Sequence, residues 1–76
     1  MESNLWTVVD NSSLIAAYKY DSEERTLDVE FKSNGAKYRY FGIPQILGES
    51  IKNQEHIGKF IKNKIIGLQL PYERIN

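Results

Sequence analysis

The chain has 76 residues, of which 41% are apolar and 26% charged, and this composition is typical of a single folded domain spanning residues 1–76. It contains no cysteine and only one histidine, so disulfide bonds, thiol catalysis and a histidine-rich metal cluster are excluded. No apolar run reaches the roughly 18–20 residues of a membrane span, and the first residues lack the regions of a signal peptide, so we expect a cytoplasmic protein.

Ten basic and ten acidic residues give a formal net charge of zero, which argues against a purely electrostatic grip on nucleic acid. The charges are nevertheless distributed unevenly. Residues 1–35 hold three Lys/Arg and seven Asp/Glu (−4), whereas residues 36–76 hold seven and three (+4). This asymmetry indicates either a basic binding face or two surfaces that are solvated differently.

The first half of the chain is predicted to form an antiparallel meander. Residues 5–9 are expected to add a short edge strand, and the apolar and aromatic residues 14–20 a longer strand that ends in the polar turn 21–24. The dipeptide Asn34-Gly35 indicates a hairpin turn, because both residues tolerate positive φ. It leads to a further strand at residues 37–41.

Residues 26–32 lie between the strands predicted at residues 14–20 and 37–41, and their apolar and polar side chains alternate strictly. Leu27, Val29 and Phe31 point to one face, as expected of a strand with one buried side. The charged positions Asp28, Glu30 and Lys32 point to the opposite face, which is expected to be solvated.

The second half is predicted to be helical. Pro44 suits the first turn of a short amphipathic helix over residues 45–53. Residues 57–65 form a clearer helix, since apolar side chains recur on one side of it and Lys59 and Lys62 project from the other. Gly67 is expected to cap that helix, and residues 68–76 to fold back as an extended tail.

These elements predict an α+β fold: a three- to four-stranded antiparallel meander with two C-terminal helices packed on one face. The core is expected where the strand and helix periods agree, at Leu27, Val29, Phe31, Phe60, Ile61 and Ile65. A chain this short often needs stabilisation beyond its core, such as disulfide bonds or a bound metal. Without cysteines or a metal cluster, self-association into a homo-oligomer is the remaining common means of stabilising it.

The residues offer little for catalysis. Ser12 and Ser13 have no evident partner base, and His56 is expected at the surface or at a helix end. Asp28 and Glu30 share a strand face, but on an alternating strand this is usually the solvated face. We therefore predict that the chain is not an enzyme, and that it has no catalytic residues, no metal site and no cofactor.

Aromatic and basic residues are the candidates for binding. Tyr38 and Tyr40 share one face of their strand while Arg39 lies on the other, and aromatic and basic residues on a sheet can build a base-stacking surface. Tyrosines also serve as core residues of thin domains. Lys59, Lys62 and Lys64 either make the helix soluble or converge with Arg39 on a phosphate-bearing ligand.

The chain resembles the KTSC domain family, named for the C-terminus of some lysyl-tRNA synthetases. The resemblance runs from about residue 8 to 75 and rests on ordered matches, namely Ser12–Ala17, Tyr20-Asp21, Thr26–Lys32, Tyr38-Arg39-Tyr40, Pro44, Gly58–Ile61, Ile65 and Pro71–Ile75. It implies a compact α+β fold and, through the synthetase context, RNA binding. Stand-alone members are small proteins of bacteria and their phages, and Lys62 and Lys64 add positive charge to the family pattern.

The leading hypothesis is a non-enzymatic module for a nucleotide-like anionic ligand. Arg39, Lys59, Lys62 and Lys64 would bind phosphate, and Tyr38 or Tyr40 would bind the base. The ligand is RNA or a small free nucleotide, such as a signalling molecule sequestered by a phage, and the zero net charge favours the smaller one. The alternative is a protein-interaction or self-associating domain, in which an acidic strand face meets the basic helix face of a neighbouring copy.

Overall fold

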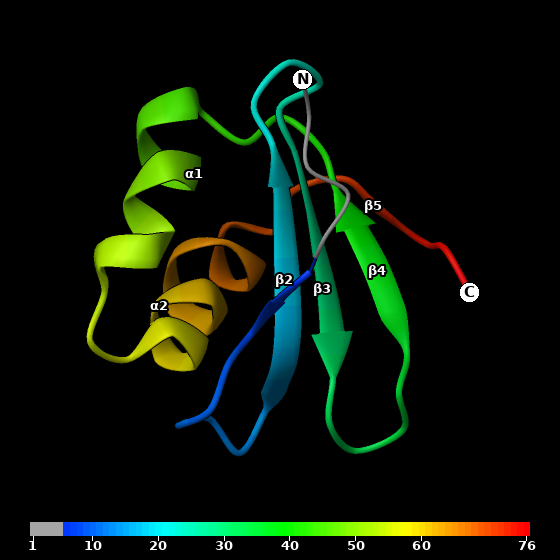
Figure 1. The fold of residues 1–76 in the computed structure, drawn as a ribbon. Coiled ribbons are helices and arrows are strands. Elements are labelled where there is room, and N and C mark those ends of the chain that lie inside the picture. The colour runs from blue at the N-terminus through cyan, green and yellow to red at the C-terminus, as the bar shows by residue number, and fades with distance from the viewer. Residues whose placement is uncertain (1–5) are drawn as a thin grey trace.

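A computed structural model describes residues 6–76, so Leu5 of the predicted edge strand lies outside the described residues. Within residues 6–76 the chain forms one five-stranded sheet in the order β1-β2-β3-β4-β5, with every pair of neighbours antiparallel (Figure 1). The strands are β1 (Thr7–Val8), β2 (Ile15–Asp21), β3 (Thr26–Phe31), β4 (Lys37–Tyr40) and β5 (Tyr72–Arg74). The predicted α+β meander is confirmed, with one strand more than the expected three or four.

The helices connect β4 to β5 and lie together on one side of the sheet (Figure 1). The first is α1 (Gln45–Ser50), continued by the 3₁₀ turn η1 (Ile51–Asn53), and the second is α2 (Ile57–Lys64), followed by the 3₁₀ turn η2 (Ile66–Leu68). Across the described part of the chain, no helix combines the length and the apolar character that a membrane crossing requires.

The prediction that Gly67 caps the end of α2 was wrong. Gly67 lies inside η2, and its φ is not positive, whereas Gln69 takes the left-handed conformation with φ +57° and ψ 43°. The reason is that α2 does not stop at a glycine but tightens into a 3₁₀ turn, so the reversal that a left-handed residue provides comes two residues later.

The fifth strand is the predicted extended tail. Tyr38 pairs with Arg74 and Tyr40 with Tyr72, so the C-terminus covers the edge of β4. The Asn76 side chain closes this edge, because its Oδ1 accepts the Lys37 N–H at 3.0 Å and its amide donates to the Gly35 carbonyl at 3.0 Å. Residues about 35 positions apart thereby become neighbours, and Tyr72 joins the tyrosines of β4.

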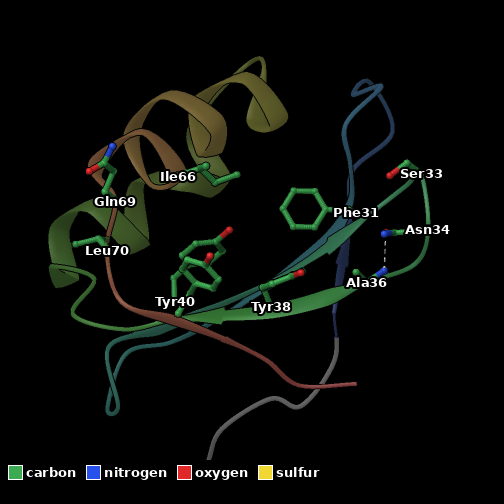
Figure 2. Close-up of a pocket in the computed structure, with 10 residues that line it drawn as sticks. Phe31, Ser33, Asn34, Ala36, Tyr38, Tyr40, Ile66, Gln69 and Leu70 are labelled. Carbon is green, nitrogen blue, oxygen red and sulfur yellow. Dashed lines mark hydrogen bonds between the residues drawn. The ribbon is translucent and has the colours of Figure 1, made fainter.

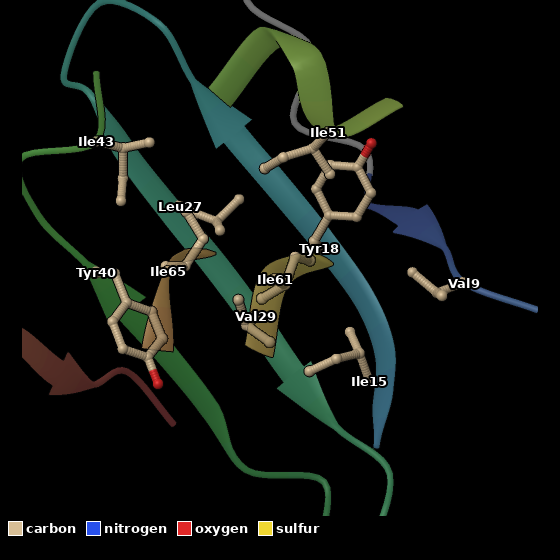
Figure 3. Packing of buried hydrophobic residues seen from close by; sticks show 10 residues of the cluster. All are labelled: Val9, Ile15, Tyr18, Leu27, Val29, Tyr40, Ile43, Ile51, Ile61 and Ile65. Atoms are coloured by element: carbon tan, nitrogen blue, oxygen red, sulfur yellow. The ribbon is translucent and has the colours of Figure 1, made fainter. Parts of the chain in front are cut away.

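The core lies between the helices and the sheet (Figure 3). Leu27 and Val29 from β3, Ile61 from α2 and Ile65 directly after α2 have no solvent-exposed surface, as predicted. The buried cluster consists of Val9, Ile15, Tyr18, Leu27, Val29, Tyr40, Ile43, Ile51, Ile61 and Ile65.

Two predicted core residues, Phe31 and Phe60, are only partly buried and pack against the cluster from its rim. Phe31 is the last residue of β3 and borders a hollow, and Phe60 lines a shallow depression on the side of α2. Their apolar character and spacing match a core position, but the layer of helices does not extend over the whole sheet.

Strand β2 contains an irregularity that the alternation of its residues does not reveal. Its register with β3 shifts between Ile15, opposite Phe31, and Ala17, opposite Glu30. A bulge of this kind inserts one extra residue, so Ile15 and Tyr18 both reach the core although three positions separate them. After the bulge Lys19 lies opposite Asp28, on the face of the sheet without helices.

Candidate ligand-binding site

Arg39 forms an ion pair with Asp28 of the same chain. Its Nε donates to Asp28 Oδ1 at 2.8 Å and its Nη2 to Asp28 Oδ2 at 3.0 Å, and Lys19 Nζ lies 3.9 Å from the same carboxylate. Hydrogen bonding to Asp28 raises the pKa of Arg39, although burial opposes this. A paired, bidentate guanidinium is poorly placed to bind an external phosphate.

The same contacts correct the prediction for Asp28. The residue was expected on a solvated face, but it is only 2% exposed. Cross-strand partners share a face of a sheet, so Arg39 from β4 and Lys19 from β2 flank Asp28 on both sides and cover it. Long basic side chains can cover a strand surface in this way while their charged ends reach water.

Tyr38 and Tyr40 point to the other face, beneath the helices, and line a hollow of about 470 Å³ (Figure 2). We call this hollow the aromatic pocket; its walls are Phe31, Ser33, Asn34, Ala36, Tyr38, Tyr40, Ile66, Gln69, Leu70 and Tyr72. Four rings adjoin one another there: Phe31 and Tyr38 have centroids 5.8 Å apart, and Tyr72 lies 5.6 Å from both Tyr38 and Tyr40.

The tyrosines of this pocket differ strongly in exposure. Tyr40 is 6% exposed and belongs to the core cluster, whereas Tyr72 is 61% exposed. Burial raises the pKa of Tyr40, and its neighbours Tyr72 and Tyr38 add to the effect. Tyr40 is therefore a core residue, which is one of the two uses that the sequence left open, and its ring also lines the pocket.

Lys59 and Lys62 line a second hollow, of about 660 Å³, between α2 and the loop that joins β1 to β2. We call it the basic groove; its walls are Asn11, Ser12, Ser13, Leu14, His56, Gly58, Lys59, Lys62 and Asn63. No carboxylate is among these residues. His56 is exposed at the start of α2, as predicted, and its side chain does not cap the helix.

The loop that forms one wall of the groove is fixed by hydrogen bonds. The Ser12 hydroxyl accepts the N–H groups of Leu14 at 3.1 Å and Ile15 at 3.0 Å. The Asn11 amide donates to the Glu55 carbonyl at 2.8 Å, and the Lys32 ammonium donates to the Ser12 carbonyl. The loop is therefore tied to the residue that follows β3 and to the segment before α2.

Gly58 sets the distance between this loop and α2. The residue is buried, and a Cβ atom built on it would overlap the hydroxyl and Cβ of Ser12. Any larger side chain would push the helix away from the loop. A glycine in the first turn of an otherwise regular amphipathic helix is the sequence signal that could have indicated this close approach.

The structure therefore separates the six predicted binding residues. Lys59 and Lys62 share the basic groove, and Tyr38 and Tyr40 share the aromatic pocket. Lys64 lines a neighbouring depression with Gln54 and Phe60, and Lys59 borders both this depression and the groove. Arg39 lies on the opposite face of the sheet, so the convergence of all the basic residues with the tyrosines does not occur.

Most lining residues of the two hollows were missed from the sequence as site residues, among them Ser12 and Tyr72. Tyr72 adjoins Tyr38, and Ser12 adjoins Gly58, across more than 30 residues each, so no local pattern marks these contacts. Within residues 6–76, no group of three or more His, Cys, Asp or Glu side chains is arranged to hold a metal ion.

The geometry defines a small two-layer α+β domain with one basic and one aromatic hollow. The KTSC domain model matches residues 11–67, and the chain belongs to this family. A crystal structure of a KTSC domain protein from Yersinia pestis has the same fold, with a TM-score of 0.80 and 26% identity over 95% of this chain and 97% of that one.

The chain is also similar to part of several lysine–tRNA ligases. That of a Nostoc species is 36% identical over 64 residues, and that of Nostoc punctiforme is 38% identical over 56 residues. These matches cover 84% and 68% of this chain but only 11% and 10% of the ligases. The similarity thus concerns one small part of those proteins.

Proposed function

We propose that this protein is a non-enzymatic cytoplasmic module that binds RNA, with phosphate groups held in the basic groove. One observation carries the proposal: two exposed lysines of α2 and a rigid polar loop line a hollow of about 660 Å³ whose walls contain no carboxylate. In a chain with zero net charge, such a local excess of positive charge directs an anion to one place.

The groove also offers hydrogen-bond donors. The Ser13 hydroxyl, the Asn63 amide and the His56 ring lie on its walls beside Lys59 and Lys62. The first turn of α2 adds the partial positive charge of a helix N-terminus, and no side chain caps it. Lysine ammonium groups together with neutral donors are the groups that commonly bind phosphate oxygens.

The relatives support RNA as the source of the phosphate. The similar segments belong to lysine–tRNA ligases, enzymes whose substrate is a tRNA by name. Because this chain matches about a tenth of those enzymes, we transfer to it only contact with RNA and not the ligation. A free nucleotide offers the same phosphate chemistry, so it must be compared with RNA directly.

Self-association is the alternative from another class. It requires the acidic strand face of one copy to meet the basic helix face of the next. Asp28, at the centre of that strand face, already has its charge neutralised by Arg39 and Lys19. A neighbouring copy would thus find a weaker acidic surface than the sequence implies.

The test is charge reversal within the groove, in the double variant Lys59→Glu/Lys62→Glu. Fluorescence anisotropy with a labelled single-stranded RNA should show at least about tenfold weaker binding, since repulsive charges replace attractive ones. Both side chains are exposed, so the free energy of unfolding should change by less than about 0.5 kcal/mol for each substitution. For the parent, with about two or three phosphates bound, log K should fall with log salt with a slope of roughly −2.

The matched control is Lys52→Glu/Lys64→Glu, which makes the same change in charge at exposed positions outside the groove. It should bind RNA more tightly than the groove variant. Equal losses in the two variants would show that only the overall charge matters and would contradict a site in the groove. Light scattering on both variants tests self-association, which predicts a change of mass for the groove variant instead.

A further inference from the structure

The aromatic pocket has the composition of a binding site rather than of an incompletely packed core. The buried ring of Tyr40 lines it (Figure 2). Tyr72, which is 61% exposed, lines it as well. The four rings adjoin one another at tilted or edge-on angles of 44° to 80°, and all four line the hollow. A volume of about 470 Å³ is within the range of small-ligand pockets.

Polar groups surround the rings. Ser33 and Asn34 lie on the hairpin between β3 and β4, and Gln69 follows η2. Asn34 Oδ1 accepts the Ala36 N–H at 3.0 Å, which leaves its NH₂ group as a donor. Gln69 holds a left-handed backbone, a conformation uncommon outside glycine that recurs at ligand sites. A ligand with a flat apolar face and a polar edge matches this arrangement.

Two segments of the chain connect the pocket with the basic groove. On β3, Phe31 lines the pocket, and the next residue, Lys32, donates a hydrogen bond to the Ser12 carbonyl in the groove. On the helical side, Lys62 lines the groove, and Ile66, four residues later, lines the pocket. The exposed Arg74 is the cross-strand partner of Tyr38 and adds positive charge on the pocket's face of the sheet.

We propose that the aromatic pocket receives one unstacked base of the RNA strand whose phosphates lie in the basic groove. This inference rests on the proposed function and adds to it a specificity for single-stranded RNA. A base has the flat face and polar edge that the rings and amides can contact, and the adjoining positive charge matches its phosphates. A base within a duplex is stacked and paired, so it cannot enter the pocket.

The experiment compares two labelled ten-nucleotide strands with the same phosphates, one carrying bases and one abasic throughout. The parent protein should bind the strand with bases about fivefold more tightly or better, because stacking one base on aromatic rings contributes at least that factor. Tyr72→Ala should remove this preference by weakening binding of the strand with bases to the abasic level. Binding of the abasic strand should not change.

Trp6→Ala is the matched control, because Trp6 is an aromatic residue on the opposite face of the sheet, over Lys19. It should keep the preference for bases. Tyr72→Leu retains apolar bulk without a ring, and it should lose the preference while melting at the temperature of the parent. If Tyr72→Ala proves less stable, this second variant decides.

The outcomes separate the two proposals. If both strands bind equally and Lys59→Glu/Lys62→Glu abolishes the binding, the groove is supported and the pocket proposal is overturned. If neither strand binds the parent, the proposed function fails, and the pocket proposal with it. If adenosine monophosphate binds as tightly as the strand and depends on Tyr72, the pocket serves a free nucleotide and the assignment to RNA is overturned.

Discussion

The two faces of β3 are buried by different means. On the face beneath the helices, Leu27 and Val29 are completely buried by apolar contacts from α2 and the neighbouring strands. On the opposite face, Asp28 is almost as well buried, at 2% exposure, but its cover is the charged side chains of Arg39 and Lys19. Apolar side chains therefore exclude water from one face of β3, and paired charged side chains exclude it from the other.

This difference separates cations used by the fold from cations that can serve a ligand. Removing two charges from water costs free energy, and a partly buried ion pair is stable only if its attraction offsets that cost. Here the two hydrogen bonds from Arg39 to Asp28 contribute this attraction. Lys59 and Lys62 are exposed on α2 and line the groove. The proposed RNA site is therefore on α2 and not on the open face of the sheet.

The strongest test of the apolar face is Leu27→Ala. It should destabilise the protein by about 2–5 kcal/mol, because the residue is fully buried and its truncation leaves a cavity. Urea unfolding followed by circular dichroism measures the loss. Phe31→Ala is the comparison, and it should cost less because Phe31 is only partly buried at the rim. An equal or greater loss for Phe31 would contradict the assigned limits of the core.

The corresponding test of the charged face is Asp28→Ala. We expect a loss of about 1–3 kcal/mol, since the hydrogen bonds to a charged partner disappear from a buried site. Arg39 is 39% exposed and can turn to water, which keeps the loss below that at Leu27. The double variant Asp28→Leu/Arg39→Leu should recover part of the stability. If Asp28→Ala unfolds at the same urea concentration as the parent, the ion pair does not stabilise this face.

Lys19→Ala should have a smaller effect, of about 0.5–1 kcal/mol. The ammonium lies 3.9 Å from the Asp28 carboxylate and 5.4 Å from the centre of the Trp6 ring, and both contacts are partly exposed. Thermal melts at low and high salt should show a smaller difference from the parent at high salt. A loss that does not respond to salt would indicate that the aliphatic stem of Lys19, rather than its charge, covers the sheet.

The smallest effect at neutral pH is expected for Tyr40→Phe, which should matter only in alkali. Burial raises the pKa of Tyr40 above its ordinary value of 10.0, so the unfolded chain loses the tyrosine proton first. Stability is therefore fully present below pH 10 and falls as the pH rises from 10 through the folded-state pKa. Urea titrations at pH 7 and pH 10.5 should show a smaller alkaline loss in Tyr40→Phe than in the parent. Equal losses would mean that Tyr40 ionises alike in both states.

The sequence predicted those parts of the fold that local periodicity controls. Alternation located β3 and its apolar face, and the helical spacing of Ile57, Ile61 and Ile65 located α2. The extended tail was expected to fold back, but not to complete the sheet as β5. These features depend on residues close in the chain, whose side chains must share a face whatever they pack against.

Only the tertiary structure decided which charges are available. Asp28 and Arg39 are 11 positions apart and meet because the register of β3 and β4 places them opposite each other. This pairing buries the charged Asp28. Gly58 meets Ser12, and Tyr72 meets Tyr38, across more than 30 residues each. Such contacts depend on register and on the docking of whole elements, so the sequence determined the layers of this protein and the packing determined its two hollows.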